Sequence, residues 1–137
     1  MDRLVKNNER IDFHVPFTVD KNILKENKDV LFIFGDNNRR FGTGGAAKLR
    51  REPNSIGFIT KKYPSNDDES FYTLEDYLPV FEEEKRRLIK IIKENWYRWI
   101  LISKLGGGLA NKYGIFEKII GPWLETLKEY KNVILLY

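Results

Sequence analysis

The stretch that decides the fold is "DVLFIFGDNNRRFGTGGAAKLRREPN", residues 29–54. It begins with an apolar run, "DVLFIF", of the kind found in strands that are buried on both faces of a parallel sheet. The chain then enters a polar turn that combines an acid, amides, glycines and arginines. Such a turn after a core strand is typical either of a ligand-binding loop or of a tight strand-to-helix connection.

Alternating strand and helix signals continue on both sides of this stretch. "IDFHVPFTV", residues 11–19, predicts an edge strand because Pro16 cannot donate to a ladder. Asp20 is expected to cap a short helix that runs through Asn27. A short helix is predicted at 44–52, and further strands are predicted at 55–62, 98–105 and 132–137.

Two longer helices follow from apolar residues at helical spacing. The first has Pro79 in its first turn and one apolar stripe, formed by Phe81, Leu88, Ile91, Ile92 and Trp96. The second runs from Ile115 to Leu127, and Gly121-Pro122 should break or kink it. Strands that alternate with helices predict an α/β fold, a three-layer α/β/α sandwich with a mostly parallel central sheet.

Length and composition indicate one globular domain over residues 1–137. The sequence is 42% hydrophobic and 32% charged, and no apolar run approaches the roughly 18 residues of a membrane helix. The first ten residues lack an apolar signal core and the chain has no cysteine. We therefore expect a cytoplasmic protein with no membrane partner.

Glycine-rich turns follow two of the predicted strands, "FGDNNRRFGTGG" at 34–45 and "SKLGGGLA" at 103–110. Glycine exposes backbone amides, and a helix that begins after each turn would add its N-terminal amides, so the two turns could clamp a diphosphate. The alternative is that the glycines only make tight turns. "GTGGAA" fits a dinucleotide fingerprint, but "DNNRRF" separates it from the strand, and the next strand ends in lysines, which argues against a Rossmann oxidoreductase.

Six pieces of the chain occur in an order that resembles a group of small macro-domain-like proteins, many of them phage-encoded. They are "FGDN", "RFGTGGAA", "RREPN", "IGFITKKYPS", "SFYTLEDY" and "GGGLA", and the resemblance covers residues 30–130. It implies a macro-domain-like fold and an ADP-ribose-type ligand. Gly35-Asp36-Asn37-Asn38 replaces the Asn-Ala-Ala-Asn of ordinary macro domains, and their adenine-holding Gly-Asp-Ile is missing, which favours a variant of ADP-ribose.

The resemblance also implies roles for individual residues. Asn37 would bind a ribose hydroxyl, and Asp36 would accept from the ligand, act as a general base or cap the turn. Phe71 and Tyr72 would stack on a base or anchor their loop to the core. The predicted ligand-binding residues are Gly35, Asp36, Asn37, Arg40, Gly42, Gly44, Gly45, Ala46, Thr60, Lys61, Phe71, Tyr72, Ser103, Gly106, Gly107, Gly108 and Leu109, with Asp36 and Asn37 as candidate catalytic residues.

Three functions remain open at this level. The first is binding of an ADP-ribose-type nucleotide, such as cyclic ADP-ribose or a related immune signal, which a phage protein could sequester against host defence. The second is a hydrolase that removes or cleaves ADP-ribose or a derivative, with Asp36 or Asn37 orienting water. The third uses the net charge of +4 to bind nucleic acid through Arg39, Arg40, Lys48, Arg50, Arg51, Lys61 and Lys62.

No cofactor or metal is expected from the sequence. The acidic run "NDDE" at 66–69 lacks the spacing of metal ligands, and His14, the single histidine, is interpreted as structural. The predicted partner is therefore a small-molecule nucleotide, and the oligomeric state is left open.

Overall fold

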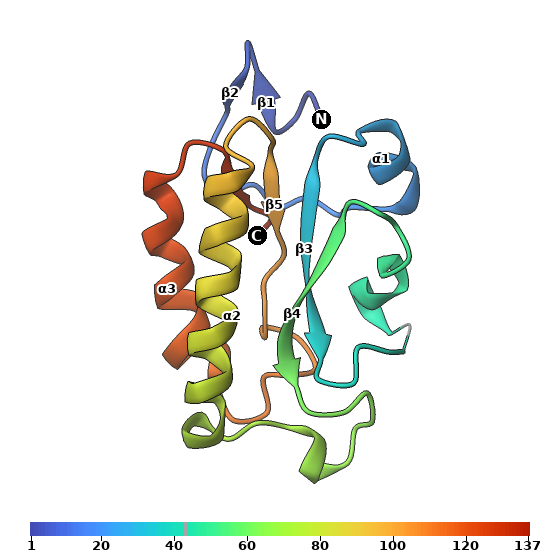
Figure 1. The fold of residues 1–137 in the computed structure, drawn as a ribbon, viewed down its shortest axis with the longest axis vertical. Coiled ribbons are helices and arrows are strands. Elements are labelled where there is room, and N and C mark those ends of the chain that lie inside the picture. Colours follow the sequence, from blue (N-terminus) through green and yellow to red (C-terminus); the bar gives the residue numbers. More distant parts are fainter. Residues whose placement is uncertain (43) are drawn as a thin grey trace.

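A four-stranded parallel sheet forms the centre of the protein, in a computed structural model that describes residues 1–42 and 44–137 (Figure 1). Its strands are β3 (Leu31–Asn37), β4 (Ser55–Lys61), β5 (Ile100–Ile102) and β6 (Val133–Leu135), in the order β4-β3-β5-β6. Each neighbouring pair is parallel. The predicted α/β class with a mostly parallel sheet is confirmed.

Helices lie on either side of the strands. α2 (Leu74–Glu94) and α3 (Gly121–Thr126) lie to the left of the strands in Figure 1, and α1 (Lys21–Glu26) lies to the right with the 3₁₀ helix η1 (Gly45–Leu49). Shorter turns are η2 (Asp68–Ser70), the π-helical η3 (Phe116–Ile120) and η4 (Leu127–Glu129).

Strand β3 is buried on both faces because its side chains alternate between two core clusters. Leu31 and Ile33 pack with residues of α2 and α3, whereas Phe32 and Phe34 pack with residues of α1 and η1. Burial on both faces explains why this segment is a continuous apolar run rather than an alternating one.

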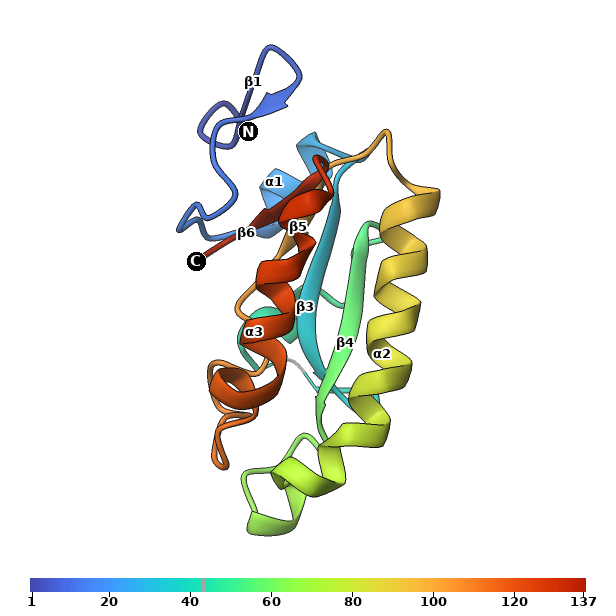
Figure 2. The ribbon, with the colours of Figure 1, turned by 90° about the vertical axis from the view of Figure 1, so that its left-hand side faces the viewer.

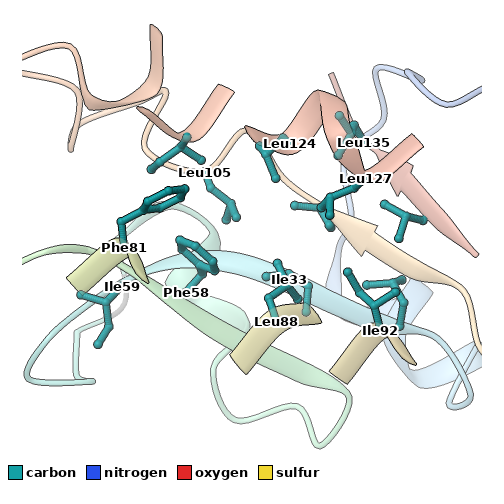
Figure 3. Close-up of a cluster of buried hydrophobic side chains, with 14 of the residues drawn as sticks. Ile33, Phe58, Ile59, Phe81, Leu88, Ile92, Leu105, Leu124, Leu127 and Leu135 are labelled. Carbon is teal, nitrogen blue, oxygen red and sulfur yellow. The ribbon is translucent and has the colours of Figure 1, made fainter. Parts of the chain in front are cut away.

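The larger cluster fills the space between the sheet and helices α2 and α3 (Figure 3). Leu88 and Ile92 of α2 point toward the strands beside Ile33. Phe58 of β4 stacks on Trp123, with ring centroids 6.0 Å apart. This packing fixes α2 and α3 against the sheet and thereby positions the loops at its carboxyl end.

Helix α2 begins earlier than the sequence led us to expect. Thr73 is its N-cap, and its Oγ1 accepts a hydrogen bond from the Asp76 N–H at 3.2 Å. Pro79 therefore lies inside the helix, and its predicted place in the first turn is wrong. Trp96 lies beyond the helix end and is 74% exposed, so the buried stripe ends at Ile92.

The other predicted helices occur with changed geometry. Asp20 caps α1 as predicted, accepting from the Ile23 N–H at 2.8 Å. The predicted helix at 44–52 is the 3₁₀ helix η1. In the C-terminal helix the chain passes from π-helical η3 into α3 at Gly121, where a Cβ would lie 2.8 Å from the Phe116 carbonyl oxygen.

The N-terminal residues form a small hairpin followed by an extended segment. β1 (Val5–Lys6) and β2 (Glu9–Arg10) pair antiparallel at the top of Figure 1. The strand predicted at 11–19 is not a regular strand; it pairs with β6 through one isolated bridge, between His14 and Leu135. Pro16 follows Val15, whose N–H donates to the Leu135 carbonyl at 2.8 Å, so the segment still covers that edge of the sheet.

No helix in the described part of the chain is long and apolar enough to cross a membrane.

Candidate functional site

The two glycine-rich loops meet at the carboxyl end of the sheet, at the bottom of Figure 1. β3 and β5 are neighbours in the sheet, and each runs directly into one of the loops. A Cβ placed on Gly35 would lie 4.0 Å from the Gly106 nitrogen and 3.3 Å from Thr60 Oγ1. Residues predicted from three separate strands therefore come together, as expected for a parallel sheet.

Strand β4 places Thr60 next to the first loop, at a point where its pairing with β3 shifts register. Asp36 pairs with Ile59 and Asn37 pairs with Lys61, so Thr60 is an extra residue at this point. The Thr60 hydroxyl donates to the Asp36 carbonyl at 3.3 Å. Bulges of this kind redirect side chains and are common next to binding sites.

Asp36 lies under the first loop with 2% of its side chain exposed. Its Oδ2 accepts a hydrogen bond from Arg50 Nη1 at 2.6 Å, and its Oδ1 accepts from the Asn37 N–H at 2.7 Å. Gly57 makes room for this carboxylate, because a Cβ there would lie 2.8 Å from the Cβ of Asp36. This is the arrangement expected if Asp36 stabilises the turn; its contact with a ligand stays a prediction.

Asn37 folds the backbone of the same turn. Its Nδ2 donates to the Phe41 carbonyl at 2.7 Å, and its Oδ1 accepts from the Arg39 N–H at 3.0 Å. Arg40 within the turn adopts a positive φ of 53°, which an L-residue adopts at a cost of about 1–2 kcal/mol. Gly42 follows with a φ of 105°.

Arg40 points back toward two buried carboxylates. Its Nη1 lies 3.5 Å from Asp36 Oδ2 and its Nη2 lies 3.8 Å from Glu84 Oε1, while 47% of its side chain stays exposed. The predicted phosphate-binding arginine is therefore tethered by ion pairs and still reaches solvent.

Glu84 was not predicted, and it belongs to a set of α2 side chains that cover the edge of β4. Its Oε2 accepts from the Ile59 N–H at 3.1 Å, and Tyr77 donates its hydroxyl to the Ile59 carbonyl at 2.6 Å. Arg87 donates to the Gly57 carbonyl and to Glu84. Glu84 lies on the same buried stripe of α2 as Tyr77. That position could have predicted a functional or structural role from the sequence, because a buried carboxylate needs a partner.

The glycines of the first loop differ in what surrounds them. A Cβ on Gly44 or on Gly45 would meet no atom within 4 Å among the described residues, whereas one on Gly42 would lie 3.3 Å from Pro64. Ala46 is half-buried in η1. The fingerprint-like run also contains Thr43, which lies outside the described residues.

The second loop is packed more tightly. Gly106 has a φ of 75°, and a Cβ there would lie 2.8 Å from Ile120 Cδ1. Ser103 is half-buried, and its N–H donates to the Ile33 carbonyl at 3.1 Å. A Cβ on Gly107 would meet the Lys104 side chain at 2.6 Å, while one on Gly108 would face open space.

The second loop ends in contacts made by exposed polar side chains. Leu109 is 72% exposed. Asn111 donates to both carboxylate oxygens of Glu117 at 2.9 Å and accepts from the Phe116 N–H at 3.0 Å. The hydrogen bond from Asn111 lowers the pKa of Glu117 below its ordinary value. The helix predicted from Ile115 to Leu127 is present, with η3 starting at Phe116. It does not begin directly after "GGGLA", so the expectation that its N-terminal amides join this loop is wrong.

A third loop, residues 62–73, closes one side of this region. Lys61 forms an isolated antiparallel bridge with Phe71 and donates its Nζ to the Ser65 carbonyl at 2.8 Å. Burial lowers the pKa of Lys61. Lys112, two residues after the second loop, pairs with Asp68, so the ends of the second and third loops are joined.

Phe71 and Tyr72 are core residues, with 8% and 5% exposed. The structure thus favours the alternative in which they anchor their loop. The exposed rings on these loops are Phe41 at 63%, Tyr63 at 37% and Tyr113 at 41%. Sequence reasoning missed them because exposure of a loop aromatic depends on the tertiary fold.

The cations predicted for nucleic-acid binding differ in what they contact. Arg50 pairs with Asp36, and Lys62 Nζ lies 3.5 Å from Asp76 Oδ2. Arg39 lies 5.1 Å over the Tyr63 ring. Lys48 and Arg51 are exposed on the η1 side of the molecule. Two of these cations, Arg50 and Lys62, therefore have carboxylate partners within the protein.

His14 lies away from the loops, at the other edge of the sheet. His14 has its Nε2 2.7 Å from Glu125 Oε1 and its Nδ1 3.1 Å from the Tyr137 carbonyl, at the β6 edge. Residues 1–42 and 44–137 contain no cluster of His, Asp and Glu side chains suited to a metal ion. Two clefts of about 700 and 620 Å³ lie elsewhere and are lined by other residues.

The fold and this edge define an α/β protein whose parallel sheet ends in two adjoining glycine-rich loops. The chain belongs to a family of unknown function (DUF7831), whose model matches residues 16–111. That range contains both glycine-rich loops and ends directly after the second. Comparison with curated proteins found no match, and comparison with solved structures found none either.

Proposed function

We propose that the protein binds an ADP-ribose-type nucleotide at the carboxyl end of the sheet, with its diphosphate between the two glycine-rich loops. The observation that carries this proposal is the meeting of the loops, with Gly35 next to Gly106 and with open space in front of Gly44 and Gly108. A diphosphate needs backbone amides that can approach closely, and glycines without neighbours allow that approach.

Backbone amides and charge support an anionic ligand. The N–H groups of Gly108 and Leu109 donate to no carbonyl of the described residues. The first amides of a 3₁₀ helix have no partner within the helix, which applies to Gly45 and Ala46 in η1. Arg40, in the turn of the first loop, is half-exposed and would supply positive charge.

The exposed rings of Phe41, Tyr63 and Tyr113 supply surfaces for a base. They take the place of Phe71 and Tyr72, whose rings lie in the core. All three rings are on the loops at this end of the sheet, where a base could stack on them. The proposed ligand therefore carries at least one flat ring in addition to its diphosphate.

Binding is favoured over hydrolysis by the state of Asp36. Both oxygens of this carboxylate accept hydrogen bonds from the protein, and its side chain is 2% exposed. A general base must reach the proton that it removes. The proposed role is therefore sequestration of a signalling nucleotide, the macro-domain-like and phage-type role that the sequence resemblance implies.

Calorimetry against ADP-ribose, cyclic ADP-ribose isomers, NAD and AMP tests the proposal, followed by chromatography of the recovered ligand. We expect one ADP-ribose-type compound to bind and to be recovered intact. A chemically changed ligand would support the hydrolase instead. If none of the four classes binds, the proposal is wrong.

Gly44→Val is the variant that tests the loop itself. Gly45 is less suited, because its φ of 55° would strain a valine whatever the space around it. Gly44 has an extended backbone, with a φ of −71°, and open space at its Cβ position. We expect an unchanged melting temperature and an affinity that falls by at least about a hundredfold, as for two or more lost charge-assisted hydrogen bonds. Lys93→Ala, at the far end of α2, is the matched control.

A further inference from the structure

A cleft of about 700 Å³ lies at the opposite end of the molecule from the glycine-rich loops. Two of its lining segments, the turn after α2 and the β1–β2 hairpin, lie at the top of Figure 1. Its lining includes Arg10, Trp96, Tyr97, Arg98, Trp99 and Lys131. Figure 2 shows the same hairpin at one end of the molecule and the loop after β4 at the other.

The aromatic residues of this cleft come from the turn "NWYRW", residues 95–99, after the end of α2. Trp96 is 74% exposed and Tyr97 is 67% exposed, and their rings meet edge to face with centroids 5.6 Å apart. Trp99 is partly buried against the core cluster of α1 and η1. The exposed rings are thus attached to a turn that is anchored in the core.

The two arginines of the cleft are held in place by backbone carbonyls. Arg10 donates to the carbonyls of Tyr130 at 2.9 Å and Val133 at 2.8 Å, and Arg98 donates to the Asp29 carbonyl at 2.6 Å. Among the described residues, neither arginine nor Lys131 forms a salt bridge.

These charges leave the cleft positive. The acid in its lining is Glu9, against three cations. The arginines are fixed by neutral carbonyls, and Asp12 is the acid whose charge acts on Arg10. The positive charge of Arg98 and Lys131 has no such counterpart among the salt bridges of the described residues. The charge of the cleft is therefore complementary to an anionic partner.

We propose that this cleft binds single-stranded nucleic acid, with bases stacked on Trp96 and Tyr97 and the phosphate backbone beside Arg98 and Lys131. Aromatic rings next to fixed positive charge are the combination used for strands whose bases are unpaired. An acidic protein segment would match the charge of the cleft. It would not supply planar bases that stack on the exposed rings of Trp96 and Tyr97. This site is separate from the proposed nucleotide site and does not depend on it.

The test is fluorescence anisotropy with a labelled oligothymidine of about fifteen nucleotides, in low and in rising salt. Trp96→Ala should weaken binding roughly ten- to hundredfold, the effect of losing one or two stacked bases. Lys131→Gln should reduce the slope of log affinity against log salt by about 0.7, one phosphate contact on a single strand. Both side chains are exposed, so the melting temperature should not change.

Gly44→Val and Phe41→Ala at the glycine-rich loops are the controls, and they should change oligonucleotide affinity less than about twofold. An equal loss in the loop variants would overturn the proposal by placing nucleic acid at the other end of the sheet. Absence of binding at low salt would also overturn it. Equal competition by a polyglutamate peptide would overturn it in favour of an acidic protein partner.

Discussion

The two glycine-rich loops are held by different forces. The first rests on buried charge: Asp36 pairs with Arg50 and caps the Asn37 amide beneath the turn. The second rests on apolar packing, because Gly106 lies directly against Ile120 and Leu105 is fully buried. The first loop therefore depends on the ion pair between Asp36 and Arg50. The second loop depends on Gly106 having no side chain, because a Cβ there would meet Ile120.

This difference separates glycines that shape the fold from glycines that leave space. Gly106 has both a positive φ and a close neighbour, so its role is structural. Gly44 and Gly108 have neither, and a fold that needs only a turn would accept another residue there. Gly44 and Gly108 are therefore the glycines whose open space we assign to the ligand.

The largest effect is expected from removing the ionic support of the first loop. Arg50→Ala leaves the Asp36 carboxylate buried without its closest partner, which typically costs about 3–5 kcal/mol. We expect about 3 kcal/mol, the lower end, because Arg40 lies 3.5 Å from the same oxygen and can compensate in part.

Urea unfolding measures this change, and Arg51→Ala is the matched control. Arg51 is the next residue and is exposed, so its loss should shift the unfolding free energy by less than about 0.5 kcal/mol. Similar midpoints for the two variants would show that the buried pair does not hold the first loop.

The second loop should respond to an added methyl group. In Gly106→Ala the left-handed backbone costs about 1–2 kcal/mol and the contact with Ile120 about 1–3 kcal/mol, so we expect a loss of about 2–5 kcal/mol. Gly108→Ala is expected to unfold like the wild type. Thermal unfolding of both proteins checks the comparison, and equal losses would remove the distinction between the two kinds of glycine.

The contrast between the loops also marks what the sequence could and could not predict. Local pattern was enough for β3, whose apolar run is buried on both faces, and for the Asp20 cap of α1. The pairing of Asp36 with Arg50 and of Glu84 with the Ile59 amide was not predicted. These contacts join residues far apart in the sequence, and local periodicity carries no information about them.

For the candidate site, the meeting of the two loops was predictable from the sequence, but the exposed aromatic rings were not. Parallel strands bring their carboxyl ends to one edge, so Gly35 and Gly106 could be placed together from the alternation of strands and helices. Which aromatic rings face solvent depends on how each loop packs. Phe71 is in the core and Phe41 is exposed, although both are loop phenylalanines in polar surroundings.

A smaller effect on stability is expected at Arg40. Arg40→Gly relieves a left-handed backbone worth about 1–2 kcal/mol but removes two long ion pairs worth up to about 1 kcal/mol each. The unfolding free energy should therefore change by less than about 1 kcal/mol, while affinity for an ADP-ribose-type nucleotide falls. A strongly destabilised variant would show that Arg40 supports the loop rather than the ligand.

The smallest effect is expected from pH, at the outer end of the second loop. The Asn111 hydrogen bond lowers the pKa of Glu117, so its folded pKa lies below its unfolded one. A carboxylate of this kind stabilises the fold above the unfolded pKa, and that contribution is lost as pH falls through the folded pKa. Because Glu117 is exposed, we expect a slight fall in melting temperature between about pH 6 and pH 3 that is smaller in Glu117→Gln. The Phe116 amide, which donates to Asn111, should titrate with Glu117 in NMR spectra. If that amide shifts equally in Glu117→Gln, the carboxylate does not hold Asn111, and the second loop depends on apolar packing alone.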